Sequence, residues 1–137
     1  MTGLLILSQG DVGHGMLHAI EHVLGSRPER LDFQPIDYHQ AHDKLVEALR
    51  TRLRKLDDGE GVLILADVYG SSHTNAACRL LEPGRVALVT GVNLPMLIRA
   101  LTYRHLPLDE LARKAASGGS EGIVIAPASP RATEAGR

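Results

Sequence analysis

Apolar and polar positions along the chain follow two alternating patterns. Short runs such as Leu4-Leu5-Ile6-Leu7 are apolar at every position, which is typical of strands buried on both faces of a sheet. Between these runs apolar residues recur at helical spacing, as Leu45, Leu49 and Leu53 do, which predicts amphipathic helices. The pattern predicts strands at residues 3–8, 31–36, 62–66, 85–90 and 122–125. It predicts helices at residues 13–24, 40–56, 74–81, 95–103 and 108–116.

Alternation of strands and helices predicts an α/β fold with an open, mainly parallel, doubly wound sheet. In such sheets ligands bind beyond the carboxyl ends of the strands, where the strand order reverses. Three loops are expected at that edge: residues 8–13, 67–75 and 91–93. They contain glycines and uncharged polar residues that can cradle an anion, so we expect the functional site there.

The size and charge of the chain narrow its class. A length of 137 residues suits one domain, expected at residues 1–126, followed by a disordered tail at 127–137 that is poor in large apolar residues. With 15 basic and 16 acidic residues the net charge is -1, which gives no electrostatic reason to expect nucleic acid or an anionic membrane as a partner. The apolar runs are strand-sized and no signal peptide is recognisable. The single cysteine, Cys78, excludes an internal disulfide and favours a cytoplasmic location.

Three histidines are the strongest metal candidates in the sequence. His14, His18 and His22 recur every fourth residue, so they share one side of a helix, and two histidines one turn apart can chelate zinc. The apolar residues of the same segment form the opposite stripe, which places the histidines on the solvated face. We therefore expect no metal site, and because no dinucleotide fingerprint is present either, no cofactor.

Two loops carry candidate chemistry. The first predicted strand ends in Ser8-Gln9-Gly10, and the amide of Gln9 neither ionises near neutral pH nor accepts a phosphoryl group. The third predicted strand ends in "ADVYGSSHTNAA", where Asp67 closes an apolar run. The following Gly70, Ser71 and Ser72 offer donors suited to a phosphoryl group. The alternative interpretation, that Asp67 and the serines only satisfy backbone donors of the turn, stays open on these grounds.

Three segments in order carry a resemblance to a known family. They are "LLILSQG", "GVLILADVYGSSHTNAACRLL" and "VTGVNLPMLIRAL", and the match extends from residue 3 to about residue 125. In these segments the chain resembles the enzyme IIA domain of the mannose family in the bacterial sugar phosphotransferase system. The phosphocarrier subunit of dihydroxyacetone kinases is a more distant relative.

The resemblance implies a sheet ordered 2-1-3-4 and a homodimer that exchanges a C-terminal fifth strand. In the family a histidine at the tip of the first loop takes a phosphoryl group from the carrier HPr and passes it to a IIB domain during sugar uptake. The matched aspartate, Asp67, orients that histidine. The resemblance assigns phosphate binding to Ser8, Gly10, Gly70, Ser71 and Ser72. It implies HPr-like and IIB-like partners, and no insertion into the membrane.

This chain departs from the family pattern at two positions. Gln9 stands where the family has histidine, and His73 follows Ser72 where the family usually has proline. Three interpretations follow. The domain has lost phosphotransfer and works as a sensor or binding partner; or His73 replaces the missing acceptor, oriented by Asp67; or His14 reaches back from the first helical turn.

Overall fold

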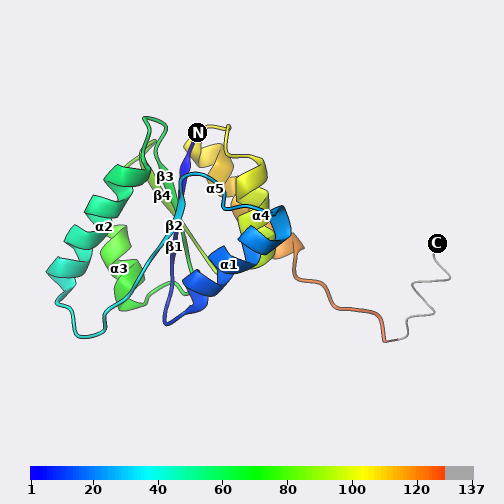
Figure 1. Ribbon diagram of the computed structural model, residues 1–137, viewed down its shortest axis with the longest axis horizontal. Helices are drawn as coiled ribbons and strands as arrows, with labels where there is room; N and C mark the ends of the chain where they lie inside the picture. Colours follow the sequence, from blue (N-terminus) through cyan, green and yellow to red (C-terminus); the bar gives the residue numbers. More distant parts are fainter. Residues whose placement is uncertain (129–137) are drawn as a thin grey trace.

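Four parallel strands form the centre of the computed structural model, which describes residues 1–128 (Figure 1). They are β1 (Gly3–Leu7), β2 (Leu31–Gln34), β3 (Val62–Ala66) and β4 (Val86–Thr90), in the order β2-β1-β3-β4. Leu7 pairs with Ala66, and Ala66 with Thr90, so β1, β3 and β4 end at the same level. The strand order confirms the prediction and places the reversal between β1 and β3.

Helices cover both faces of the sheet. One face carries α1 (Val12–Leu24), α4 (Leu94–Thr102) and α5 (Leu108–Glu121), and the other carries α2 (His42–Leu56) and α3 (Ser72–Cys78), as Figure 1 shows. Successive side chains of a strand point to opposite faces, so each strand contributes to two separate cores. Leu4 and Ile6 pack beneath the first group of helices, whereas Leu5 and Leu7 pack beneath the second. Burial on both faces explains the unbroken apolar runs.

Several boundaries differ from the prediction for identifiable reasons. Strand β2 ends before Pro35, which has no N–H to donate to the sheet. Helix α3 begins at Ser72 rather than at residue 74 because Ser71 caps it. Helix α5 continues to Glu121 instead of ending at residue 116. Its glycines remain helical because they allow close packing on α4: a Cβ on Gly118 would lie 2.5 Å from the Cβ of Arg99.

The C-terminal segment forms no strand within this chain. Residues 123–127 have no secondary structure, and Ile123, Val124 and Ile125 are 75%, 77% and 96% exposed. The fifth strand expected at 122–125 therefore stays a prediction that requires a second chain. Most of the expected disordered tail, from residue 129 onward, lies outside the described residues. Within residues 1–128, no helix combines the length and apolar character needed to cross a membrane.

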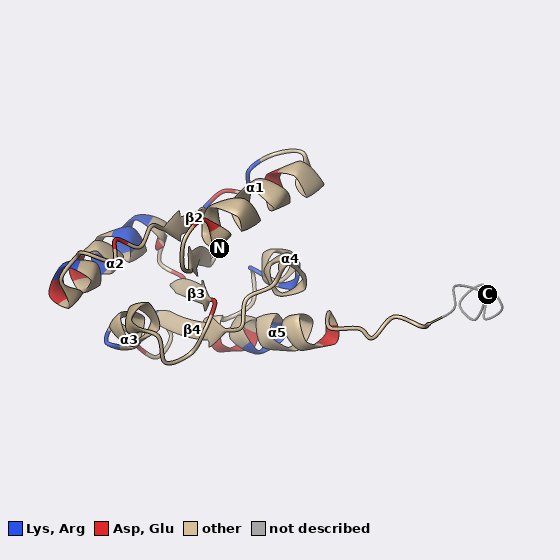
Figure 2. Cartoon of the chain, turned by 90° about the horizontal axis from the view of Figure 1, so that it is seen from below, with Lys and Arg blue, Asp and Glu red and all other residues tan. Residues whose placement is uncertain are grey.

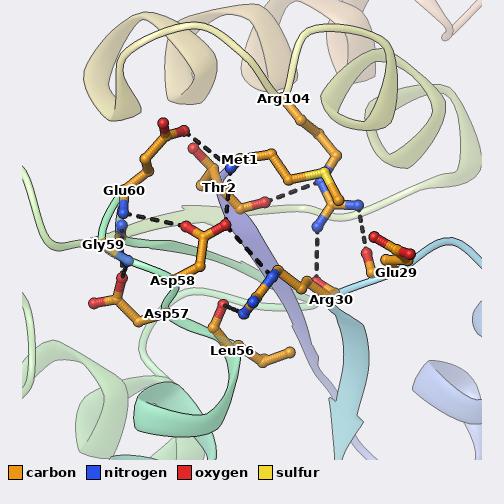
Figure 3. Close-up of polar contacts among 11 residues, drawn as sticks. Met1, Thr2, Glu29, Arg30, Leu56, Asp57, Asp58, Gly59, Glu60 and Arg104 are labelled. Carbon is orange, nitrogen blue, oxygen red and sulfur yellow. Dashed lines mark hydrogen bonds and ion pairs between the residues drawn. The ribbon is translucent and has the colours of Figure 1, made fainter.

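Arg104 joins three segments at the amino edge of the sheet (Figure 3). Its guanidinium donates hydrogen bonds to the carbonyl oxygens of Thr2, Glu29 and Arg30. The side chain is buried, and burial lowers its pKa. A planar fork of donors can satisfy three carbonyl groups at once, so Arg104 fixes the start of β1 against the loop that leads into β2.

Candidate functional site

Three loops meet at the carboxyl edge of the sheet, as the sequence predicts. The N–H of Gln9 donates to Oδ2 of Asp67 at 2.9 Å, which joins the loop after β1 to the loop after β3. The N–H of Gly91 donates to the carbonyl oxygen of Asp67 at 3.0 Å, which adds the loop after β4. Asp67 is therefore the centre of the site.

Glycines give two of these loops their shape. Gly10 has φ 53° and Gly70 has φ 86°, a left-handed conformation that other residues rarely adopt. No atom lies within 4 Å of a Cβ built on either glycine, so backbone conformation, not crowding, requires glycine here. The side on which a Cβ would project is therefore open to a ligand at both glycines.

The carboxylate of Asp67 is held as an anion by three donors. Oδ2 accepts from Gln9, while Oδ1 accepts from the N–H of Val68 at 2.8 Å and lies 2.7 Å from Nε2 of His73. Partial burial alone would raise the pKa of Asp67, but the hydrogen bonds from His73, Gln9 and Val68 outweigh burial, so the pKa lies below its ordinary value. The site contains a fixed negative charge that can orient an imidazole.

His73 is buried rather than exposed at the start of its helix. Its side chain is only 2% exposed, and it packs against the sheet from the first turn of α3. Because an ionised carboxylate only accepts hydrogen bonds, Nε2 donates to Asp67, which leaves Nδ1 as the ring nitrogen that could act as a nucleophile. Within residues 1–128 this Nδ1 makes no hydrogen bond. The pair has the arrangement of an oriented imidazole, in a ring that is almost completely buried.

Of the serines predicted to bind phosphate, two have hydroxyl groups that are capped or buried within the protein, and one has a hydroxyl group that is free. Ser71 is the N-cap of α3: its Oγ accepts from the N–H of Thr74 at 3.2 Å, so for Ser71 the capping interpretation is confirmed. Ser8 is buried, and its Oγ would lie 2.9 Å from a Cβ on Gly13, where α1 closely approaches β1. The exposed Ser72 makes no side-chain hydrogen bond to any described residue. Of the three hydroxyls, that of Ser72 is the one free to meet a ligand.

Two polar residues of this region carry no role in the sequence-based prediction. Tyr38 accepts a hydrogen bond from the N–H of Gly10 through its hydroxyl at 3.2 Å. No local pattern indicates this contact, since it joins segments 28 residues apart. Asn93 caps α4 by accepting from the N–H of Met96 and donates to the carbonyl oxygen of Gly119 at 3.0 Å. Asn93 is thus a structural residue, and an asparagine directly before Leu-Pro is a recognisable capping signal.

The histidine stripe of α1 lies on the exposed face, as predicted. His14, His18 and His22 are all exposed. The ring of His14 packs against Phe33 and His18, with centroid distances of 5.4 and 6.4 Å. The ring of His14 therefore packs against Phe33 and His18, and no contact supports the interpretation in which His14 reaches back to the site. Among the residues that the structure describes, no group of three or more His, Cys, Asp or Glu side chains could hold a metal ion.

Exposed apolar side chains lie in or next to two of the three loops. Val12 follows the first loop, and Val68 and Tyr69 belong to the second. They are 49%, 57% and 74% exposed, respectively. Large apolar side chains this exposed beside a polar site are a feature of surfaces that bind other proteins.

Comparison with known proteins places the chain in a family. The family model described as "PTS system fructose IIA component" matches residues 3–116. The fold, the site at the strand ends and this match together define a IIA domain of the sugar phosphotransferase system. The chain belongs to the mannose-type EIIA family. The resemblance seen in the sequence is thereby confirmed.

Relatives and solved structures agree with this assignment. The mannose-specific EIIAB component of Escherichia coli strain K12 is 33% identical over 132 residues, covering 93% of this chain and 40% of the relative. The fructose-specific EIIA component of Bacillus subtilis is 28% identical and covers 81% of this chain and 77% of the relative. The chain thus spans two fifths of the length of the mannose-specific relative.

Structural similarity extends over nearly the whole chain. EIIA from Streptococcus agalactiae superimposes with a TM-score of 0.80 at 24% identity, covering 91% of this chain and 97% of that one. The mannose/sorbose-specific IIA subunit from Enterococcus faecalis gives 0.81 at 20% identity, covering 93% and 96%. These likenesses establish the fold.

Proposed function

We propose that this IIA-type domain serves sugar uptake or its regulation by docking HPr-like and IIB-like carriers, with its own phosphotransfer impaired at position 9. One observation carries the proposal. The N–H of Gln9 donates to Asp67 where the strand order reverses, which puts residue 9 at the acceptor position of the site. The side chain at this position is an amide. An amide nitrogen has no available lone pair with which to attack phosphorus, whereas a neutral imidazole has one.

The exposed apolar surface supports the docking part of the proposal. Val12, Val68 and Tyr69 surround the site on two loops. A carrier protein must bring its phosphoryl group to the loop tips, so its contact surface has to include these side chains. We place the domain in the cytoplasm with such carriers.

An alternative function is phosphoryl transfer through His73. The 2.7 Å contact between Nε2 of His73 and Asp67 favours it, because it reproduces an aspartate-oriented imidazole with Nδ1 as the nucleophile. Its obstacle is the burial of the ring.

A second alternative is a purely regulatory module that binds proteins without any phosphoryl chemistry. The domain would then recognise the phosphorylation state of a carrier through the open loops at Gly10 and Gly70. It shares the docking surface with the main proposal and differs in having no place in the transfer chain.

A homodimer completes the proposed assembly. Within the described residues, strand β4 pairs with one strand, β3, and its other side carries a single bridge between Val86 and Glu82, so it forms an edge whose five residues are all half-buried. Exposed sheet edges invite pairing with another chain. The apolar segment at Ile123–Ile125 of a second copy has the composition of a strand that could cover this edge.

Phosphoryl transfer can be tested directly. The chain is incubated with enzyme I, HPr and phosphoenolpyruvate carrying a labelled phosphoryl group, beside a IIA domain that has histidine at the tip. The proposal predicts no label on this chain while the histidine-bearing domain is labelled. Acid-labile, base-stable label that disappears in His73→Gln would establish the His73 alternative instead.

A further inference from the structure

A cavity of about 200 Å³ lies on the α2–α3 face of the sheet, at the opposite end of the strands from Asp67. Val62 and Val86, the first residues of β3 and β4, belong to its floor together with Leu53 and Leu80. Its rim is charged and consists of Arg50, Arg54, Asp57, Glu82 and Arg85. The cavity thus combines an apolar floor with a rim that carries three guanidinium groups.

The cavity exists because α3 is short. Helix α3 has seven residues and ends at Cys78, so it covers only the carboxyl half of β3 and β4. Residues 79–85 return the chain to the start of β4. The last turns of α2 close the other side of the cavity through Leu53 and Arg54.

One acid and one arginine of the rim are held in place. Asp57 accepts hydrogen bonds from the N–H groups of Gly59 and Gly61 at 2.8 and 3.0 Å, and it pairs with Arg85 at 2.8 Å. Figure 3 shows Asp57 beside Gly59. Partial burial alone would raise the pKa of Asp57, but the two N–H groups and Arg85 outweigh burial and lower it. Asp57 therefore stays ionised, neutralises part of Arg85 and fixes its position.

The other two rim arginines, Arg50 and Arg54, outnumber the remaining rim carboxylate, Glu82, which forms no ion pair with a described residue. Arg50 and Arg54 are one turn apart on α2, so their side chains lie on the same side of the helix. Arg54 makes no ion pair with the residues that the structure describes. Arg50 has only Glu47 at 3.4 Å, and that glutamate is 67% exposed; an exposed pair of this kind contributes little. Figure 2 shows basic residues along α2.

We infer that this cavity binds a small organic anion, with its charged head on Arg50 and Arg54 and a compact apolar body on Leu53, Leu80 and Val86. Guanidinium groups match the geometry of phosphate and carboxylate oxygens. An apolar floor with few convergent polar groups is the usual construction of a small-molecule site. The site shares no residue with the carboxyl edge, so it is independent of the function proposed there.

Phenyl phosphate is a suitable probe because it joins a dianionic head to a compact ring. Its titration into the protein is followed by NMR of the methyl groups of Leu53, Leu80 and Val86, with phenol as the neutral probe and benzoate as the carboxylate. We expect saturable shifts with phenyl phosphate or benzoate and none with phenol. Arg54→Gln should weaken binding by about tenfold, the effect of losing one hydrogen bond to a charged group.

Arg113→Gln is the matched control, since Arg113 is exposed on α5 over the other face of the sheet. It should leave binding unchanged. Arg50→Gln repeats the test in case Arg54→Gln alters folding, which circular dichroism reveals. Equal binding of phenol and phenyl phosphate, equal effects of the α2 and α5 variants, or no saturable shift with any anion would overturn the inference.

Discussion

At the scale of single residues, Asp67 organises the site and Gln9 limits its chemistry. Three groups donate hydrogen bonds to the Asp67 carboxylate. One is the N–H of the adjacent Val68, and the other two, from Gln9 and His73, come from residues that are not adjacent to Asp67 in the sequence. The sequence indicates that Asp67 and Gln9 meet, because both follow adjacent strands of a parallel sheet. It does not indicate that His73 is buried, since burial depends on the register of α3, which Ser71 sets through its cap.

Removal of the Asp67 charge should destabilise the protein in a pH-dependent manner. The pKa of Asp67 is lowered in the folded state, so its contribution is present above the unfolded pKa and is lost as pH falls through the folded value. Asp67→Asn should lower the free energy of unfolding by about 1 to 3 kcal/mol at pH 7. In urea unfolding the difference from wild type should shrink toward pH 3. Glu47→Gln, an exposed change on α2, should show neither effect, and a difference for Asp67→Asn that grows on acidification would contradict this role.

At the scale of elements, helix packing explains where the sequence-based boundaries fail. The strands were predictable because apolar runs buried on both faces have no polar interruption. The end of α5 was not, because Ser117-Gly118-Gly119 resembles a helix stop. Only the approach of Arg99 and Met96 shows that these glycines are required by packing between α4 and α5.

Two helical glycines should respond to alanine with opposite signs. A Cβ on Gly118 would lie 2.5 Å from the Cβ of Arg99, so Gly118→Ala should destabilise the protein by about 1 to 3 kcal/mol through overpacking. Gly15 lies in α1 with nothing within 4 Å of a built Cβ, so Gly15→Ala should stabilise it by roughly 0.5 to 1 kcal/mol. Urea unfolding of both variants decides the matter; equal effects would show that α4 and α5 pack less closely than described.

At the scale of the whole molecule, the β4 edge of the sheet is the edge at which we expect a second chain to pair. Apart from one bridge between Val86 and Glu82, strand β4 is unpaired on its outer side among the described residues, and the apolar residues Ile123, Val124 and Ile125 are exposed. The apolar pattern suggests a short strand at residues 122–125, whereas its exchange between two subunits is suggested only by the family resemblance.

Val124→Lys should convert the proposed dimer to a monomer. A lysine in the exchanged segment would place an ammonium group at the covered edge of β4, which is unfavourable without a partner charge. Light scattering after gel filtration should give twice the chain mass for wild type and the chain mass for the variant. Lys114→Glu, exposed on α5, is the control and should remain dimeric. A monomeric wild type would remove the exchanged strand.

The most direct measurement of the central claim is phosphoryl uptake by Gln9→His beside the wild type. Both proteins are exposed to enzyme I, HPr and labelled phosphoenolpyruvate. If the amide at position 9 is what blocks transfer at an otherwise intact site, Gln9→His should take up close to one phosphoryl group per chain and the wild type none. Equal labelling of both proteins, or a Gln9→His variant that folds and stays unlabelled, would contradict the account.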